Sequence, residues 1–231
     1  LDSSDDVDVR FFVGRADLVG SSGDAGGSNF TAAGGGGEDS DIVDPIVGPL
    51  LVTLPSCADD EKRCKTFGSF RYFLERSTLA TSPSEDGARH RPFDFFCNFD
   101  DDTYVVVPTL LRVLSKYLRN PPNYGHNLYV GRQSFPGGLY GGRIHFHTGA
   151  AYCLSADLLH QGAPHFDSIV SGTTLADDVA VGEMVGNRLN VTLVDDERFH
   201  SHLEILDQHK IPRDDLADQV SFGYNNRWKG T

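Results

Sequence analysis

The sequence has no apolar run of eighteen residues, so it contains no transmembrane helix. It also has no signal peptide and no initial methionine, and we therefore expect an excised segment whose N-terminal anchor lies outside it. Basic residues are few, 20 against 33 acidic ones, and the net charge of −13 argues against a nucleic-acid binder, which needs a basic face. An anionic substrate is compatible with this charge because a bound metal ion reverses the sign locally.

Cysteine is scarce, and its four copies form no C-x-x-C pair, which argues against a zinc knuckle or a thioredoxin-like site. The even count suits two disulfides and hence a secretory compartment, whereas four buried free thiols are the alternative. Two N-x-S/T sequons, at Asn29 and Asn190, are compatible with that compartment. The sequence also lacks a Walker A loop, a Rossmann fingerprint and a G-x-S-x-G elbow.

Alternating apolar strands and amphipathic helices predict an α/β protein with a largely buried sheet. We expect an acidic segment with a possible edge strand over 1–19, a Gly/Ser-rich insertion over 20–40 and one main domain over 41–231. The insertion is expected to be disordered because it has too few apolar side chains to offset its ordering entropy. The predicted strands are Val9–Val13, Leu50–Leu54, Phe93–Phe99, Leu128–Gly131, Ala150–Leu154 and Val191–Val194, and the predicted helices are Lys62–Arg76, Pro108–Leu118, Ala156–His160 and a stretch from Val179.

Three adjacent carboxylates, Asp100, Asp101 and Asp102, follow the apolar run that ends at Phe99. Like charges so close together raise each other's pKa and are costly to bury, and a divalent cation is the usual compensation. The cluster thus indicates a metal-assisted enzyme acting on a phosphorylated donor. A solvated loop or a helix cap is the plainer alternative. A haloacid-dehalogenase phosphatase fits poorly, because Tyr104 stands where its D-x-D-x-T/V loop needs Thr or Val.

Two further polar groups precede or follow predicted elements. Asp177 and Asp178 stand just before a helical pattern, where they suit either a pair of N-caps or a carboxylate general base. His200 and His202 follow a predicted strand and share one face by alternation, and imidazole is a good ligand for Mn²⁺ beside carboxylates. A structural histidine is the alternative for either position.

Together these blocks resemble the Fringe-like glycosyltransferases, part of the inverting β1,3-glycosyltransferase family. The order and spacing of the blocks agree with the family over roughly residues 46–226. The matching blocks are Phe96–Val105, Tyr129–Gly131, Thr148–Ser155, Leu175–Gly182, Phe199–Glu204 and Gln219–Tyr224.

The resemblance implies a GT-A fold, in which a Rossmann-like mixed sheet flanked by helices binds a nucleotide-sugar. It implies that Asp100, Asp101 and Asp102 form the D-x-D motif that binds the UDP-sugar donor, and that Asp178 is the catalytic base. Asp102 and His200 would hold Mn²⁺, or Mg²⁺ in its place, against the diphosphate. The family pattern also implies the disulfides Cys57–Cys64 and Cys97–Cys153. The family's first βα unit is not recognisable before Val9, so we expect an N-terminally truncated domain.

The activity implied by the resemblance is transfer of GlcNAc from UDP-GlcNAc, in β-1,3 linkage, to a glycan acceptor such as protein O-linked fucose. Two alternatives remain open: a UDP-Gal-dependent β-1,3-galactosyltransferase of core-1 type, and an inactive sugar-binding or scaffold domain. The implied location is the Golgi lumen, as part of a type II membrane protein whose anchor lies outside this chain. The implied partners are a nucleotide-sugar donor and a glycan or glycoprotein acceptor, with no nucleic acid.

Overall fold

The computed structural model describes residues 10–15, 51–58, 60–79, 93–100, 103–119, 127–134, 137–172, 174–200 and 213–223. The expected insertion over 20–40, the carboxylates of Asp101 and Asp102, and His202 lie outside these residues. The chain divides into two compact units, Leu1–Ser69 and Phe70–Thr231. No helix among the described residues combines the length and the apolarity that a membrane span requires.

The N-terminal unit contains two parallel strands, β1 (Phe11–Arg15) and β2 (Leu51–Ala58). β1 begins and ends two residues later than the predicted strand Val9–Val13, and β2 extends past the predicted end at Leu54 because it continues through Pro55. The register is irregular between the rungs at Thr53 and Ala58, so Pro55 falls where a missing N–H breaks no regular ladder. Helix α1 (Lys62–Leu79) follows and crosses the boundary between the two units.

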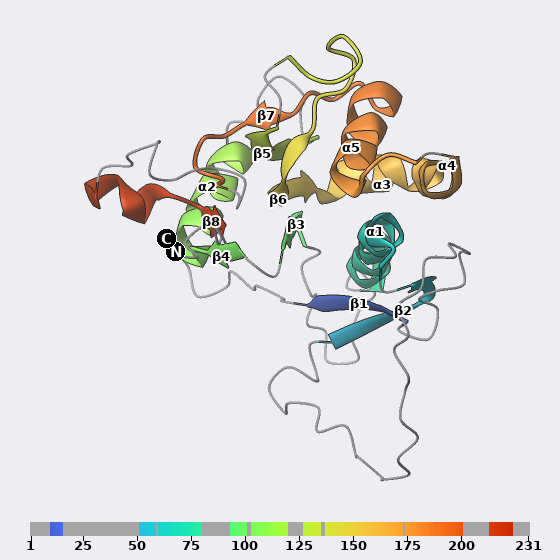
Figure 1. Ribbon diagram of the computed structural model, residues 1–231. Coiled ribbons are helices and arrows are strands. Elements are labelled where there is room, and N and C mark those ends of the chain that lie inside the picture. Colours follow the sequence, from blue (N-terminus) through green and yellow to red (C-terminus); the bar gives the residue numbers. More distant parts are fainter. Residues whose placement is uncertain are drawn as a thin grey trace, which may run out of the picture. The chain divides into compact units, whose positions relative to one another are not determined.

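The C-terminal unit is built around a four-stranded mixed sheet, which confirms the predicted α/β class (Figure 1). Its strand order is β3-β6-β5-β7. The strands are β3 (Phe95–Phe99), β5 (Tyr129–Gln133), β6 (His147–Ser155) and β7 (Val194–Asp195). Strand β6 is antiparallel to β3 and β5, whereas β7 is parallel to β5. The carboxyl ends of β3, β5 and β7 therefore meet the start of β6 at one edge of the sheet.

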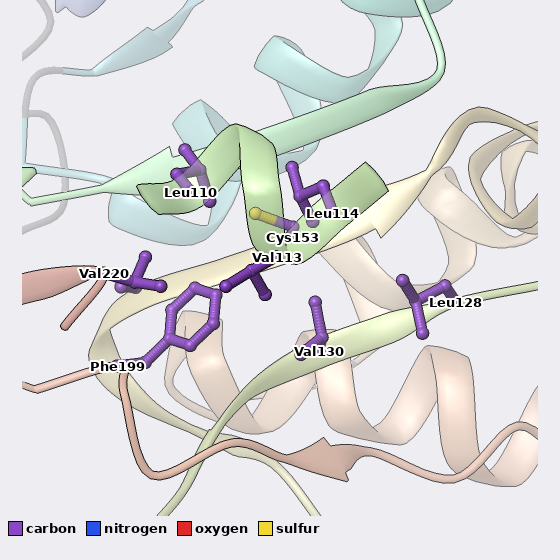
Figure 2. Packing of buried hydrophobic residues seen from close by; sticks show 9 residues of the cluster. Leu110, Val113, Leu114, Leu128, Val130, Cys153, Phe199 and Val220 are labelled. Atoms are coloured by element: carbon purple, nitrogen blue, oxygen red, sulfur yellow. The ribbon is translucent and has the colours of Figure 1, made fainter. Parts of the chain in front are cut away.

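Helix α2 (Val107–Arg119) covers one face of this sheet. Its apolar side chains recur at helical spacing, and three of them, Leu110, Val113 and Leu114, are buried. They pack against Val130 of β5 and Cys153 of β6 (Figure 2). Pro108 lies in the first turn of α2, where its missing N–H costs no intrahelical bond.

The opposite face of the sheet packs against aromatic side chains and helices. Figure 1 shows α3 (Ala156–Gly162), α4 (Phe166–Gly172) and α5 (Asp177–Gly182) on the far side of β6 from α2. Phe70 of α1 packs edge-on against Phe96, with ring centroids 5.1 Å apart. Strand alternation decides this partition, because successive residues of a strand point to opposite faces.

A second, two-stranded sheet pairs β4 (Thr103–Val105) with β8 (Ser221–Gly223). Neither strand was predicted, because three residues are too short to show a period. The strand predicted over Val191–Val194 is shorter in the structure, where only Val194–Asp195 pairs with β5.

Both disulfides that the family resemblance implied are present. Cys57–Cys64 joins β2 to the start of α1, and Cys97–Cys153 joins directly opposite residues of β3 and β6. The structure therefore excludes the alternative of four free thiols.

Candidate active site

The first predicted site residue, Asp100, follows β3 at the shared edge of the sheet. Its carbonyl oxygen accepts the backbone N–H of Thr103 at 3.0 Å, so the two flanks of the carboxylate cluster are tied together. β4 then begins at Thr103 and leads away to pair with β8. Asp100 therefore follows a strand of one sheet, and Thr103 begins a strand of another.

Asp177 and Asp178 form the first turn of α5, but neither caps it. The N-cap is Ala176, which offers no side-chain acceptor, so the interpretation as a pair of N-caps is wrong in position. Asp178 instead accepts the backbone N–H of Val179 with Oδ1 at 2.7 Å. This bond satisfies one of the helix's orphan donors and orients the carboxylate.

Helix α5 is pressed closely against the segment that leads into β6. A methyl group on Gly182 would come within 2.7 Å of both the carbonyl oxygen of His145 and the Cβ of Phe146. Val179, next to Asp178, packs in the same small core as Phe146. Helix α5 is therefore held beside the segment that leads into β6 at His147.

A buried polar pair lies at this junction. The hydroxyl of Tyr129 is 2.6 Å from Nδ1 of His147 and accepts the backbone N–H of the same histidine at 3.1 Å. Burial lowers the pKa of His147 to about 3, so its imidazole is neutral at ordinary pH. Burial likewise raises the pKa of Tyr129 well above its usual range.

Strand β6 bulges between His147 and Tyr152, and the bulge brings their side chains together. Gly131 of β5 is opposite Tyr152, yet Gln133, only two residues on, is opposite His147. The two rings are consequently in contact, with centroids 3.9 Å apart and planes tilted by 30°. Gly131 permits this, since a Cβ there would lie 3.2 Å from that of Tyr152 and 3.3 Å from that of His147.

Three of the predicted carboxylates raise the pKa of Tyr152. The pKa of its phenol is raised well above the usual range, mainly by burial and next by the neighbouring phenol of Tyr129. The carboxylates of Asp177, Asp100 and Asp178 raise it further through space. Coulomb energies fall with distance, so carboxylates that raise the pKa of Tyr152 must lie near it. The end of β3 and the start of α5 are therefore both near this buried side chain.

His200, the predicted metal ligand, is buried and held in one tautomer. Its Nε2 is 2.8 Å from Oε1 of Gln219, whose own amide nitrogen donates to the carbonyl oxygen of Asp215. The amide oxygen of Gln219 thus faces His200 and accepts its Nε2–H. The ring also stacks on Phe222 with centroids 5.9 Å apart.

The backbone around His200 is fixed from both sides. Its N–H donates to Oγ of Ser221 in β8, and the preceding Phe199 bridges the same residue. The turn before it is anchored by Asp196, which is buried and accepts two side-chain hydrogen bonds from Arg198. Because Phe199 bridges Ser221 of β8, and β8 pairs with β4, two strand spacings of roughly 10 Å separate the backbone at His200 from that of β4.

The carboxylate cluster that begins at Asp100 and the imidazole of His200 are types of ligand that suit a divalent cation. A hydrogen bond that orients an imidazole through its other nitrogen is the usual support of a metal-binding histidine. Among the described residues, no group of three or more His, Cys, Asp and Glu side chains lies close enough to hold a metal ion. Because Asp102 lies outside those residues, shared ligation by Asp102 and His200 stays a prediction.

The comparison with known proteins decides the family. A family model described as Fringe-like matches residues 52–231, well over half of the chain. The chain belongs to the Fringe-like family. This Fringe-like chain is 31% identical over 147 residues to the β-1,3-N-acetylglucosaminyltransferase lunatic fringe of Gallus gallus, a match that covers 56% of the chain and 39% of the relative.

Two other relatives give the same result. The Fringe glycosyltransferase of Drosophila melanogaster is 34% identical over 158 residues, which cover 58% of the Fringe-like chain and 36% of the relative. The human lunatic fringe enzyme is 32% identical over 147 residues, which cover 56% and 37%. The chain therefore matches well under half the length of these curated relatives.

Sequence reasoning did not single out Tyr129, His147 or Tyr152 of this Fringe-like chain as site residues. The available signal was indirect: Tyr129 and Gly131 alternate on one face of a predicted strand, and His147 begins a Gly-containing block. The bulge that joins His147 to Tyr152 has no sequence period, so only the strand register reveals it.

Proposed function

We propose that this chain forms the catalytic part of a metal-dependent inverting glycosyltransferase with a GT-A fold. It transfers GlcNAc from UDP-GlcNAc, in β-1,3 linkage, to a glycan acceptor such as protein O-linked fucose. One observation carries the proposal: Asp100 follows β3, and α5, whose first turn holds Asp178, packs at Gly182 against the segment that leads into β6, the strand paired with β3. In this proposal a donor-binding carboxylate and a base share one edge of the sheet. The names of the relatives support the choice of sugar and linkage.

Asp178 serves as the general base in this proposal. Its carboxylate takes the proton of the acceptor hydroxyl as that oxygen bonds to the anomeric carbon, and the bond from that carbon to the diphosphate oxygen breaks. The electron pair of the broken bond leaves with UDP, and the sugar inverts. The N–H of Val179 holds Oδ1 in place, and a carboxylate has about four lone-pair sites, so this bond leaves capacity for the transferred proton.

The donor diphosphate is bound at the end of β3 by the D-x-D segment. Asp102 and His200 would hold Mn²⁺ or Mg²⁺, and Asp100 and Asp101 would bind the donor. The ion would supply positive charge that stabilises the departing diphosphate. The Nε2–H of His200 donates to Gln219, and this hydrogen bond fixes the orientation of the imidazole. The protein thus contributes an imidazole that is oriented before the ion binds.

A secretory location follows from the same proposal. Cys97 and Cys153 are joined across β3 and β6, and Cys57 and Cys64 across a second link, as is typical of an oxidising compartment. We place the enzyme in the Golgi lumen, where a nucleotide-sugar and a glycoprotein acceptor meet.

A donor-hydrolysis and transfer assay tests the proposal. UDP-GlcNAc and UDP-Gal are each incubated with the protein, with and without Mn²⁺, and UDP release is measured. We expect Mn²⁺-dependent release from UDP-GlcNAc, increased by an O-fucosylated peptide. Preferential use of UDP-Gal with an O-GalNAc peptide would reassign the enzyme to the core-1 galactosyl class. Release from neither donor, with UDP still bound, would indicate a sugar-binding or scaffold domain.

A further inference from the structure

The contacting pair of His147 and Tyr152 presents two polar groups that the protein itself does not satisfy. The Tyr152 side chain is 2% exposed, and its hydroxyl has no hydrogen-bond partner among the described residues. A buried hydroxyl without a partner costs free energy, so such a group in a folded protein needs an explanation.

The second group is Nε2–H of His147, and its presence follows from the pairing with Tyr129. The Tyr129 hydroxyl accepts the backbone N–H of His147, and among the described residues Nδ1 is the acceptor within reach of its own hydrogen. Nδ1 therefore accepts, and the proton of the neutral imidazole is on Nε2. No hydrogen bond within the described part of the chain engages that Nε2–H.

Both groups belong to a rigid frame. Gly131 packs against the Cβ atoms of His147 and Tyr152, and the two rings are in contact. The Tyr129 hydroxyl fixes the imidazole, and the ring of Tyr129 packs edge-on against that of Tyr152 at 6.3 Å. The rings are therefore oriented before any ligand arrives, which lowers the entropic cost of binding.

The charges around the pair select the kind of ligand. The imidazole is neutral, the phenol is neutral, and the carboxylates of Asp100, Asp177 and Asp178 lie near enough to act on Tyr152. A diphosphate would find no positive charge on the pair itself. A neutral ligand rich in hydroxyl groups needs no such charge, and each hydroxyl can both donate and accept.

We infer that Tyr152 Oη and His147 Nε2–H form a subsite for hydroxyl groups of the transferred sugar. The inference rests on the proposed function and adds the residues that hold the hexose. In that scheme the diphosphate lies at the end of β3 and the base at the start of α5, so the hexose being transferred must lie between them. Tyr152 is the side chain that the carboxylates of Asp100 and Asp178 both influence. Tyr152 and His147 are positioning residues and take no part in bond breaking.

Tyr152→Phe tests the subsite, because it removes the unpartnered hydroxyl and keeps the ring contact. Binding of UDP and of UDP-GlcNAc is measured by calorimetry in the presence of Mn²⁺, with unfolding of the ligand-free protein measured alongside. We expect an unchanged affinity for UDP and an affinity for UDP-GlcNAc that falls about fivefold or more, as for one lost hydrogen bond. The ligand-free variant should unfold at the same or a higher temperature.

Tyr117→Phe is the matched control. Tyr117 is half-buried on the opposite face of the sheet, and its hydroxyl has an internal partner, Asp196, at 3.0 Å. This variant should lose stability and keep the relative affinities for UDP-GlcNAc and UDP. A second measurement pairs Tyr152→Phe with UDP-sugars deoxygenated at C3, C4 or C6. The deoxygenation whose cost disappears in the variant identifies the hydroxyl that Tyr152 contacts.

Three results would overturn the inference. Unchanged binding of both ligands by Tyr152→Phe would mean that the two groups are satisfied by buried water only. Equal weakening of UDP and UDP-GlcNAc would place the nucleotide, and not the sugar, against the pair. If the loss of affinity caused by each deoxy sugar simply adds to the loss caused by Tyr152→Phe, no sugar hydroxyl contacts Tyr152 directly. Failure of the wild-type protein to bind UDP or UDP-GlcNAc would instead contradict the proposed function itself.

Discussion

Tyr129 and His147 are joined by two hydrogen bonds: the tyrosine hydroxyl accepts the histidine backbone N–H at 3.1 Å and lies 2.6 Å from its Nδ1. The side chains come from neighbouring antiparallel strands, β5 and β6, and both are buried. The pair anchors the start of β6, where burial keeps the imidazole neutral.

This burial makes His147 a source of acid sensitivity. The unfolded chain takes up a proton near pH 6.5, whereas the folded His147 does so only near its pKa of about 3. The unfolded state therefore binds more protons between these values, and stability falls as pH drops through that window. At pH 5 we expect a loss of about 2 kcal/mol relative to pH 7 from this group.

Urea unfolding at pH 7 and pH 5 checks the effect of His147. The variant His147→Gln loses the bond to Tyr129 and should be less stable at both pH values, but its loss on acidification should be about 2 kcal/mol smaller than in the wild-type protein. An equal loss on acidification in both proteins would contradict the assignment.

The two disulfides should differ in their contribution to stability. Cys97 and Cys153 are 56 residues apart and Cys57 and Cys64 only 7, and a longer closed loop restricts the unfolded chain more. Replacing both members of a pair with Ala should cost about 4 kcal/mol for the long loop and about 2 kcal/mol for the short one. Equilibrium unfolding of the two double variants measures the difference, and the reverse order would refute the loop-entropy account.

Asp178→Asn should abolish transfer while nucleotide-sugar binding survives. The amide keeps an oxygen that can accept the N–H of Val179, so the turn is preserved, but it cannot take a proton from the acceptor. Loss of a general base costs about 10² to 10⁴ in rate. Turnover and UDP-GlcNAc affinity are measured in parallel.

Asp157→Asn is the matched control for Asp178→Asn. Asp157 is an exposed carboxylate in the first turn of α3, so it shares the helix position of Asp178 and lies outside the proposed site. It should retain full turnover. If Asp178→Asn instead loses UDP-GlcNAc affinity together with its melting temperature, Asp178 is structural.

The metal assignment predicts a shared effect of Asp102 and His200. Asp102→Ala and His200→Ala should each weaken Mn²⁺-dependent UDP binding, and the double variant should be little weaker than either, because both side chains hold one ion. His160→Ala, an exposed histidine of α3, should bind UDP normally. UDP binding of equal strength in excess EDTA would rule out the metal, and additive losses would rule out shared ligation.

Asn190 should carry an N-linked glycan when the chain passes through a secretory pathway. It is exposed, as is Thr192 of the same sequon, and its φ of 54° suits asparagine better than most residues. Thr192→Ala is the better test, since it removes the sequon without straining that backbone position. Digestion with an N-glycosidase should shift the wild-type band by one more glycan than the variant band. Identical shifts would show that the site is unused.

The sequence by itself determined the elements and the family. The apolar stripe of α2, the buried run that ends at Asp100 and the aspartates before Val179 are local patterns, and each predicted its helix, strand or loop within a few residues. The order of the motif blocks gave the Fringe-like family and both disulfide pairings. Periodicity carries this information because helix and strand repeats are set by the backbone alone.

Only the tertiary structure decided what meets at the site. The strands β4 and β8 are too short to show a period, yet their pairing sets the surroundings of His200. The grouping of Asp100 and Asp178 around Tyr152 depends on the order β3-β6-β5-β7 and on the close approach of α5 at Gly182. The approach of the His147 ring to that of Tyr152 follows from a bulge that shifts His147 into register with Gln133. These are non-local contacts, which depend on packing between distant segments and leave no repeat in the sequence.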